Sequence, residues 1–170
     1  MLLNHRLLTL ICAMLFLTAC GNGQNNTPEK RSDPHLYTTN KEDRPMNQAM
    51  ATARQKFPRF DSAFKSGRYD KDKFSIKVRL VCPDGNEYIW LTDISKVGTH
   101  YWGVMTDTPR MTNQYKVGDH VKINYADITD WLYGKDSTLH GGYTLRLIYN
   151  RLSDKERADQ EAGFPYKIED

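Results

Sequence analysis

The first strongly patterned segment of the chain runs from Pro45 to Gly67. Apolar residues recur in it at spacings of three and four, which places them along one side of an α-helix. Pro45 suits the first position of such a helix, and Gly67 suits its end. Pro58 is expected to stop or kink the helix, because proline lacks a backbone N–H group. The stripe predicted to face the core consists of Met46, Met50, Ala53, Phe57, Phe60 and Phe64.

A different pattern, with a period of two, begins at Phe74. Apolar residues alternate with polar ones from Phe74 to Leu80, as in a half-buried β-strand. Turn-forming residues at 83–86 lead to a second strand at 87–94, so the two strands are expected to form a hairpin. Three further short strands are predicted at 101–106, 121–125 and 128–133.

The period changes again after the glycine pair at 141–142. Leu145, Ile148 and Leu152 lie three and four residues apart, as on a helix, and residues 153–156 have the capping-box pattern that starts another helix. The sequence therefore predicts an α+β fold. Its parts are an N-terminal helix, a small curved antiparallel sheet or partly open barrel of about five strands, and C-terminal helices.

The first twenty residues have the pattern of an export signal. A basic start at 5–6 precedes about eleven mostly apolar residues at 7–17, too few to span a bilayer. Leu17-Thr18-Ala19-Cys20 then resembles the lipobox of bacterial lipoproteins, in which the cysteine receives a diacylglyceryl group, the peptide is cut before it, and its new amino group is acylated. The resemblance implies lipidation at Cys20, with fatty-acyl chains such as palmitate as the anchor. An ordinary secretory signal, cut elsewhere, is the alternative.

These patterns divide the chain into four parts. Residues 1–19 are predicted to be the signal peptide, 20–44 a lipidated flexible tether, 45–165 one α+β domain, and 166–170 a loose tail. Gly21 follows the cysteine, and by the sorting rule of lipoproteins this favours the outer membrane, facing the periplasm, if the host is Gram-negative. The expected location is therefore the bacterial cell envelope.

Composition narrows the function classes further. The chain has 170 residues, of which 39% are hydrophobic and 26% charged, enough for one domain with its own core. A net charge of +3 is too small to indicate a nucleic-acid partner. Cys12 is expected to leave with the signal and Cys20 to carry lipid. Cys82 then has no partner for a disulfide within the chain, and it is expected to be buried.

The part of the chain after the signal contains no motif of a known catalytic set. His35, His100, His120 and His140 lack the paired spacing of metal ligands, and we interpret them as surface histidines. No nucleophile elbow, phosphate-cradling loop or Cys/His pair occurs. The sequence therefore predicts no catalytic residue, no metal site and no cofactor, and the protein is expected not to be an enzyme.

Two groups of residues are candidates for binding. Gly141, Gly142 and Thr144 open a predicted helix, where backbone N–H groups can hold an anion, although a glycine pair at such a corner also serves chain geometry alone. Aromatic side chains gather in the sheet half, and those facing outward would form a contact surface for a protein partner. Packing beneath the helices is the alternative for them. The residues predicted for this surface are Trp90, Trp102, Trp131, Tyr133 and Tyr143.

Five short motifs follow one another along the chain. They are Phe57-Pro58-Arg59-Phe60, Glu87-Tyr88-Ile89-Trp90-Leu91, Lys116-Val117-Gly118-Asp119, Ile128-Thr129-Asp130-Trp131-Leu132-Tyr133 and Gly141-Gly142-Tyr143-Thr144. In this order they resemble the YegJ-like bacterial domain of unknown function, over roughly residues 45–152. The resemblance supports the domain boundaries and implies no catalytic residue.

Together these patterns predict a non-enzymatic, membrane-anchored binding or accessory lipoprotein of the cell envelope. An immunity-type protein that captures a toxin is one version, and an accessory subunit of an envelope complex is another. The expected partners are the membrane, through the N-terminal lipid, and an unidentified protein, but not nucleic acid. The alternative is a small envelope enzyme acting through Gly142, Tyr143 and Thr144 with Asp130.

Overall fold

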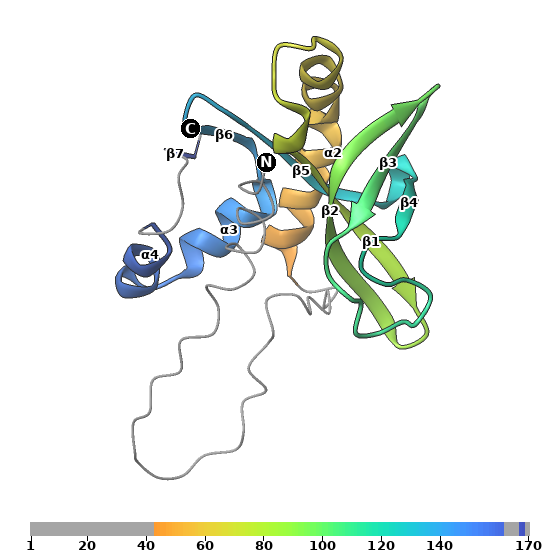
Figure 1. Cartoon of the computed structure of the whole chain (residues 1–170). Coiled ribbons are helices and arrows are strands. Elements are labelled where there is room, and N and C mark those ends of the chain that lie inside the picture. Colours follow the sequence, from red (N-terminus) through yellow and green to blue (C-terminus); the bar gives the residue numbers. More distant parts are fainter. Residues whose placement is uncertain (1–42, 162–166, 169–170) are drawn as a thin grey trace.

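A computed structural model of the chain describes residues 43–161 and 167–168 (Figure 1). The predicted signal peptide, the lipidation at Cys20, nearly all of the tether and most of the tail lie outside these residues. The helices are α2 (Arg44–Lys65), α3 (Tyr143–Arg151) and α4 (Asp154–Glu161), with 3-10 turns η1 (Lys71–Lys73) and η2 (Tyr125–Asp127). The strands are β1 (Phe74–Cys82), β2 (Gly85–Val97), β3 (His100–Met105), β4 (His120–Ile123), β5 (Ile128–Lys135), β6 (Thr138–Gly141) and β7 (Lys167–Ile168).

The strands form one open sheet in the order β4-β3-β2-β1-β5-β6-β7. Neighbouring strands are antiparallel, except that the two-residue β7 runs parallel to β6. The predicted α+β fold, with an N-terminal helix, an antiparallel sheet and C-terminal helices, is confirmed. To the strands expected from the sequence the structure adds β6 and β7.

A short connection forces the sheet to curl. β4 and β5 are four strand spacings apart in the sheet order, which would be about 19 Å in a flat sheet. Only Asn124 and η2 connect Ile123 to Ile128, and five fully extended residue steps span at most about 17 Å. Because η2 is coiled rather than extended, its real reach is shorter still. The sheet must therefore bend until β4 approaches the start of β5.

Helix α2 fills the hollow of the curled sheet, and in Figure 1 it lies between strands β1–β4 and helix α3. Its predicted apolar stripe is buried. Phe60 is fully buried and packs edge-on against Phe74 of β1, with ring centroids 5.3 Å apart, and against Trp131 of β5, at 5.8 Å. Trp131 Nε1 also donates a 2.7 Å hydrogen bond to Ala53 O. The core thus forms where one helix meets several strands.

Asp43, the residue before α2, holds the start of this helix. At the first turn Asp43 accepts a 3.1 Å hydrogen bond from Met46 N, and its carboxylate also pairs with Arg151 of α3 at 2.8 Å. The Arg151 side chain accordingly lowers the pKa of Asp43.

Helix α2 does not stop at Pro58 but continues to Lys65. Within the described residues, no helix has the length and apolar character needed to cross a membrane.

Candidate functional site

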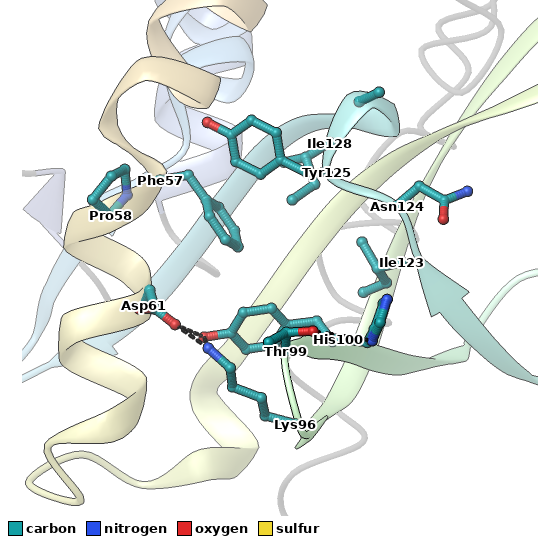
Figure 2. A pocket seen from close by; sticks show the side chains of 12 residues that line it. Phe57, Pro58, Asp61, Lys96, Thr99, His100, Ile123, Asn124, Tyr125 and Ile128 are labelled. Carbon is teal, nitrogen blue, oxygen red and sulfur yellow. Dashed lines mark hydrogen bonds and ion pairs between the residues drawn. The ribbon is translucent and has the colours of Figure 1, made fainter.

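A pocket of about 600 Å³ opens between α2 and the β3–η2 part of the sheet (Figure 2). Its apolar wall comes from three elements that are distant in sequence: Phe57 on α2, Ile123 on β4 and Tyr125 on η2. The Tyr125 ring lies edge-on to Phe57 at 5.7 Å, and 56% of the Tyr125 residue remains exposed. The pocket therefore exists because the curl of the sheet brings η2 against α2.

Pro58 determines how α2 and η2 are joined. Because proline has no N–H group, it cannot donate to Arg54 O, the acceptor one helical turn earlier. The Tyr125 hydroxyl donates to this carbonyl instead, at 2.8 Å. Arg54 also reaches across, and its Nη1 donates to Ile128 O at 3.2 Å. A proline inside the helix thus provides the acceptor that fixes the opposite wall of the pocket.

The mouth of the pocket carries a cluster of polar side chains centred on Asp61. Tyr101 OH donates a 2.6 Å hydrogen bond to Asp61 Oδ1, and Lys96 Nζ also pairs with this oxygen. Lys65 Nζ pairs with Oδ2 at 2.5 Å. The Lys96 ammonium lies 4.5 Å from the centre of the Tyr101 ring, a favourable cation–π geometry. Thr99 and His100 complete the polar side of the mouth.

The protonation states of Asp61 and Tyr101 are fixed over the ordinary pH range. Burial by itself would raise the pKa of Asp61, but the hydrogen bonds from Lys65, Lys96 and Tyr101 outweigh it and hold the pKa well below its usual value. Burial, followed by the Asp61 carboxylate, raises the pKa of the Tyr101 hydroxyl far above its ordinary value. Asp61 therefore stays ionised and Tyr101 stays protonated, so neither is suited to proton transfer near neutral pH.

The N-terminus of α3, predicted as an anion site, is already occupied by a carboxylate of the chain itself. Asp130 Oδ1 accepts from Tyr143 N at 3.0 Å, and Asp130 Oδ2 accepts from Thr144 N at 2.7 Å and Thr144 Oγ1 at 2.6 Å. Trp131 N donates to Oδ1 as well. Asp130 is fully buried, which raises the pKa of its carboxyl, while these hydrogen bonds act in the opposite direction. The prediction of a free anion site there was wrong.

The glycine pair before α3 serves chain geometry, the alternative given above. Gly141 and Gly142 have positive φ angles of 81° and 68°. A Cβ atom at Gly141 would lie 2.2 Å from Trp131 O and 2.5 Å from the Trp131 ring, so a side chain cannot fit there. Asp130, which the sequence placed in the alternative enzyme site, is fully buried and has no exposed surface.

The aromatic residues predicted as a contact surface divide into two groups. Trp90, Trp131 and Tyr133 are 8%, 1% and 6% exposed, so they belong to the interior and not to a surface. Their prediction as an outward patch was wrong, because α2 and the β6–α3 region cover the sheet where they lie. Trp102 and Tyr143 are half-buried and keep some surface. Tyr125, the most exposed aromatic residue of the pocket, was not selected from the sequence.

A second buried carboxylate holds the 106–119 segment. Glu87 on β2 is 2% exposed and accepts hydrogen bonds from Arg110 N at 2.9 Å and from Met111 N at 3.0 Å. Cys82 lies nearby and is buried, as expected, and burial raises the pKa of its thiol. Within residues 43–161 and 167–168, no three His, Cys, Asp or Glu side chains are grouped closely enough to hold a metal ion.

These features define a class of small α+β domain in which one long helix fills a curled antiparallel sheet. The chain belongs to the family described as "Uncharacterized protein conserved in bacteria (DUF2314)", whose model matches residues 43–166. The predicted resemblance to the YegJ-like domain is thereby confirmed.

Two relatives illustrate this membership. The uncharacterized protein YegJ of Escherichia coli (strain K12) is 26% identical over 151 residues, which cover 89% of this chain and 92% of that protein. A putative ankyrin repeat protein of Neisseria meningitidis serogroup B (strain ATCC BAA-335 / MC58) is 26% identical over 141 residues, 78% of this chain but 55% of that protein. No solved structure matches the chain.

The role of Pro58 can be tested with a double-mutant cycle. Tyr125→Phe is expected to lower the free energy of unfolding by about 1 kcal/mol, because Arg54 O loses its donor. In a Pro58→Ala background the same change should cost close to nothing, because the new backbone N–H group supplies the missing bond. Urea unfolding of the four proteins measures both costs. An equal cost in both backgrounds would contradict the coupling.

Asp61 should contribute to stability in a pH-dependent way. Its pKa is lowered in the folded state from an ordinary 3.8, so its contribution is complete above that pH and is lost as the pH falls below it. Asp61→Asn should therefore cost about 1–3 kcal/mol at neutral pH, with the difference from wild type narrowing below pH about 4. Urea unfolding across this range measures the difference. The control, Asp84→Asn in an exposed turn, should change the free energy of unfolding by less than about 0.5 kcal/mol at neutral pH.

Proposed function

We propose that this chain is a lipid-anchored, non-enzymatic binding module of the bacterial cell envelope, which holds a partner protein in the pocket between α2 and η2. The observation that carries the proposal is the pocket itself. It combines an apolar wall, in which the Tyr125 ring is exposed and Phe57 is buried, with a charged group, Asp61, whose hydrogen-bonding partners are already supplied by the protein. Such a site is suited to recognition, because its charges are fixed and its rings are rigid.

The amino-terminal pattern supports the location. A lipobox at residues 17–20 would attach two or more acyl chains to Cys20, and two or more chains anchor a protein stably where one does so only marginally. In a Gram-negative host, Gly21 favours the outer membrane, with the domain in the periplasm. Capture of a toxin, as by an immunity protein, and service as an accessory subunit of an envelope complex are two forms of the same function.

A relative adds modest support for a protein as the partner. The Neisseria meningitidis protein described above carries the name of a putative ankyrin repeat protein. Ankyrin repeats form extended surfaces for contact with other proteins. The similarity of this chain to a protein of that name supports a role in protein association.

The anchor is tested by a single cysteine. Cys20→Ser should move the protein from the membrane fraction to the supernatant after cell lysis, because the thiol that carries the lipid is lost. Cys12→Ser is the matched control, since Cys12 lies in the segment removed with the signal, and this variant should stay with the membranes. If Cys20→Ser sediments with the membranes like wild type, the anchor is absent.

The pocket is tested by photocrosslinking in living cells of the native host. A photoreactive phenylalanine analogue at position 99, at the mouth of the pocket, should give one discrete adduct with a second protein. The same analogue at position 81 is the control. Val81 is 71% exposed and pairs with Asn86, about 33 Å along β2 from Lys96. Adducts of equal yield at both positions, or none at position 99, would refute the pocket as the binding site.

A further inference from the structure

Strand β4 is an open edge of the sheet next to the pocket. It pairs with β3 alone, and in the described part of the chain no strand pairs with its other side. Met105 N donates to Asp119 O at the end of this ladder, and in an antiparallel ladder the bonded positions alternate. The backbone groups of Val121 and Ile123 therefore point to β3, while those of His120 and Lys122 point outward, where an added strand could bond to them.

The two faces of β4 differ in chemistry. His120 and Lys122 are exposed, and Lys122 lies beside the half-buried Trp102 of β3 on the outer face. Val121 and Ile123 are buried on the inner face, and Ile123 is part of the pocket wall. A strand added to β4 would thus place every second side chain over a basic row and the others toward an apolar row that continues into the pocket.

From these two observations we propose that an extended segment of a partner protein, with acidic and apolar residues in alternation, adds to β4 as a further strand and places one apolar side chain in the pocket. The proposal rests on the function proposed above and names the chemistry of its partner. Peptides that bind by strand addition gain affinity from backbone hydrogen bonds and specificity from pockets for alternate side chains. The outward backbone groups of Lys122 and the pocket wall at Ile123 are adjacent in sequence, so both elements meet at the end of β4.

Charge favours an acidic segment. Lys96 at the mouth of the pocket and Lys65, one helical turn beyond Asp61, share the Asp61 carboxylate, so this cluster carries a net positive charge. His120 and Lys122 extend the basic character along the edge of the sheet. Opposite charges on facing strands stabilise the pairing, and like charges directly opposite each other destabilise it. For the same reason a second copy of this chain is a poor occupant, since two β4 edges would bring the Lys122 side chains of both copies together.

The length of β4 explains why the pocket is needed. With four residues, the strand offers the outward backbone groups of only two of them, which is too little for a stable complex by itself. Short edge strands that carry lysine are also a common protection against unwanted pairing. An apolar side chain held in the pocket against the exposed ring of Tyr125 would supply the remaining affinity and would select the partner.

The test uses the purified full chain in detergent and a fluorescent decapeptide of alternating glutamate and leucine or phenylalanine, with binding measured by anisotropy. Two isomers of the peptide carry backbone N-methyl groups, one on the glutamates and the other on the apolar residues. One alternate set of N–H groups faces β4 and the other faces solvent. Methylation of one set should therefore weaken binding at least about tenfold, and methylation of the other less than about twofold.

A series at position 122 tests the same contact from the protein side. Lys122→Thr keeps the backbone N–H group and removes the charge, so it should weaken binding about two- to fivefold. Lys122→Pro also removes the outward N–H group without taking a bond from the β3–β4 ladder, and it should weaken binding at least about tenfold. Circular dichroism shows whether each variant is folded, and the two methylated peptides test the proposal on the wild-type chain alone.

Several results would overturn the proposal that an acidic and apolar segment of a partner protein adds to β4. They are absence of peptide binding, equal effects of the two methylation patterns, wild-type affinity of a folded Lys122→Pro variant, and a dimer of this chain that Lys122→Pro dissolves. The photocrosslink at position 99 separates the two proposals. If that adduct forms while the peptide does not bind, the binding function stands and strand addition is wrong. If neither is observed, both are wrong.

Discussion

A missing hydrogen-bond donor in the middle of α2 determines how this helix meets η2, the connection between β4 and β5. Pro58 leaves Arg54 O without its helical partner, so this carbonyl needs a donor from outside the helix. The Tyr125 hydroxyl fulfils this need and ties η2 to the helix. Since η2 is the short connection between β4 and β5, the same bond also fixes the curl of the sheet. The position of the pocket follows from this contact.

Three carboxylates show how burial decides the use of an acidic residue. Asp130 is completely buried and caps α3, so it replaces the free backbone N–H groups that would otherwise attract an anion. Glu87 is nearly as buried and holds the 106–119 segment by its backbone. Asp61 lies at the surface end of the core and keeps two lysines and a tyrosine in fixed positions. Each stabilises local geometry, and only Asp61 does so at an accessible pocket.

The sequence predicted the elements well where their signal was local. The stripe of α2 and the alternation in β1 are patterns of neighbouring residues, and both were confirmed. The four-residue β6 was missed, because it ends in the glycine pair and is too short to establish a period. The capping of α3 could not be predicted in this way, since Asp130 lies 13 residues before Tyr143 and meets it only through the fold.

The pocket was not predicted either, because its residues are distant in sequence and meet only through the fold. Its walls come from residues between Phe57 and Ile128, and no spacing rule connects a helix to a turn that follows the fourth strand. The residues predicted as a contact surface included all three tryptophans. A curled sheet filled by a helix buries tryptophan first, because tryptophan has the most apolar surface to remove from water. Tyr125 remains outside because its hydroxyl is needed at the surface of α2. Among the described residues, the exposed aromatic residue of the pocket is therefore the one that satisfies a polar requirement of the backbone.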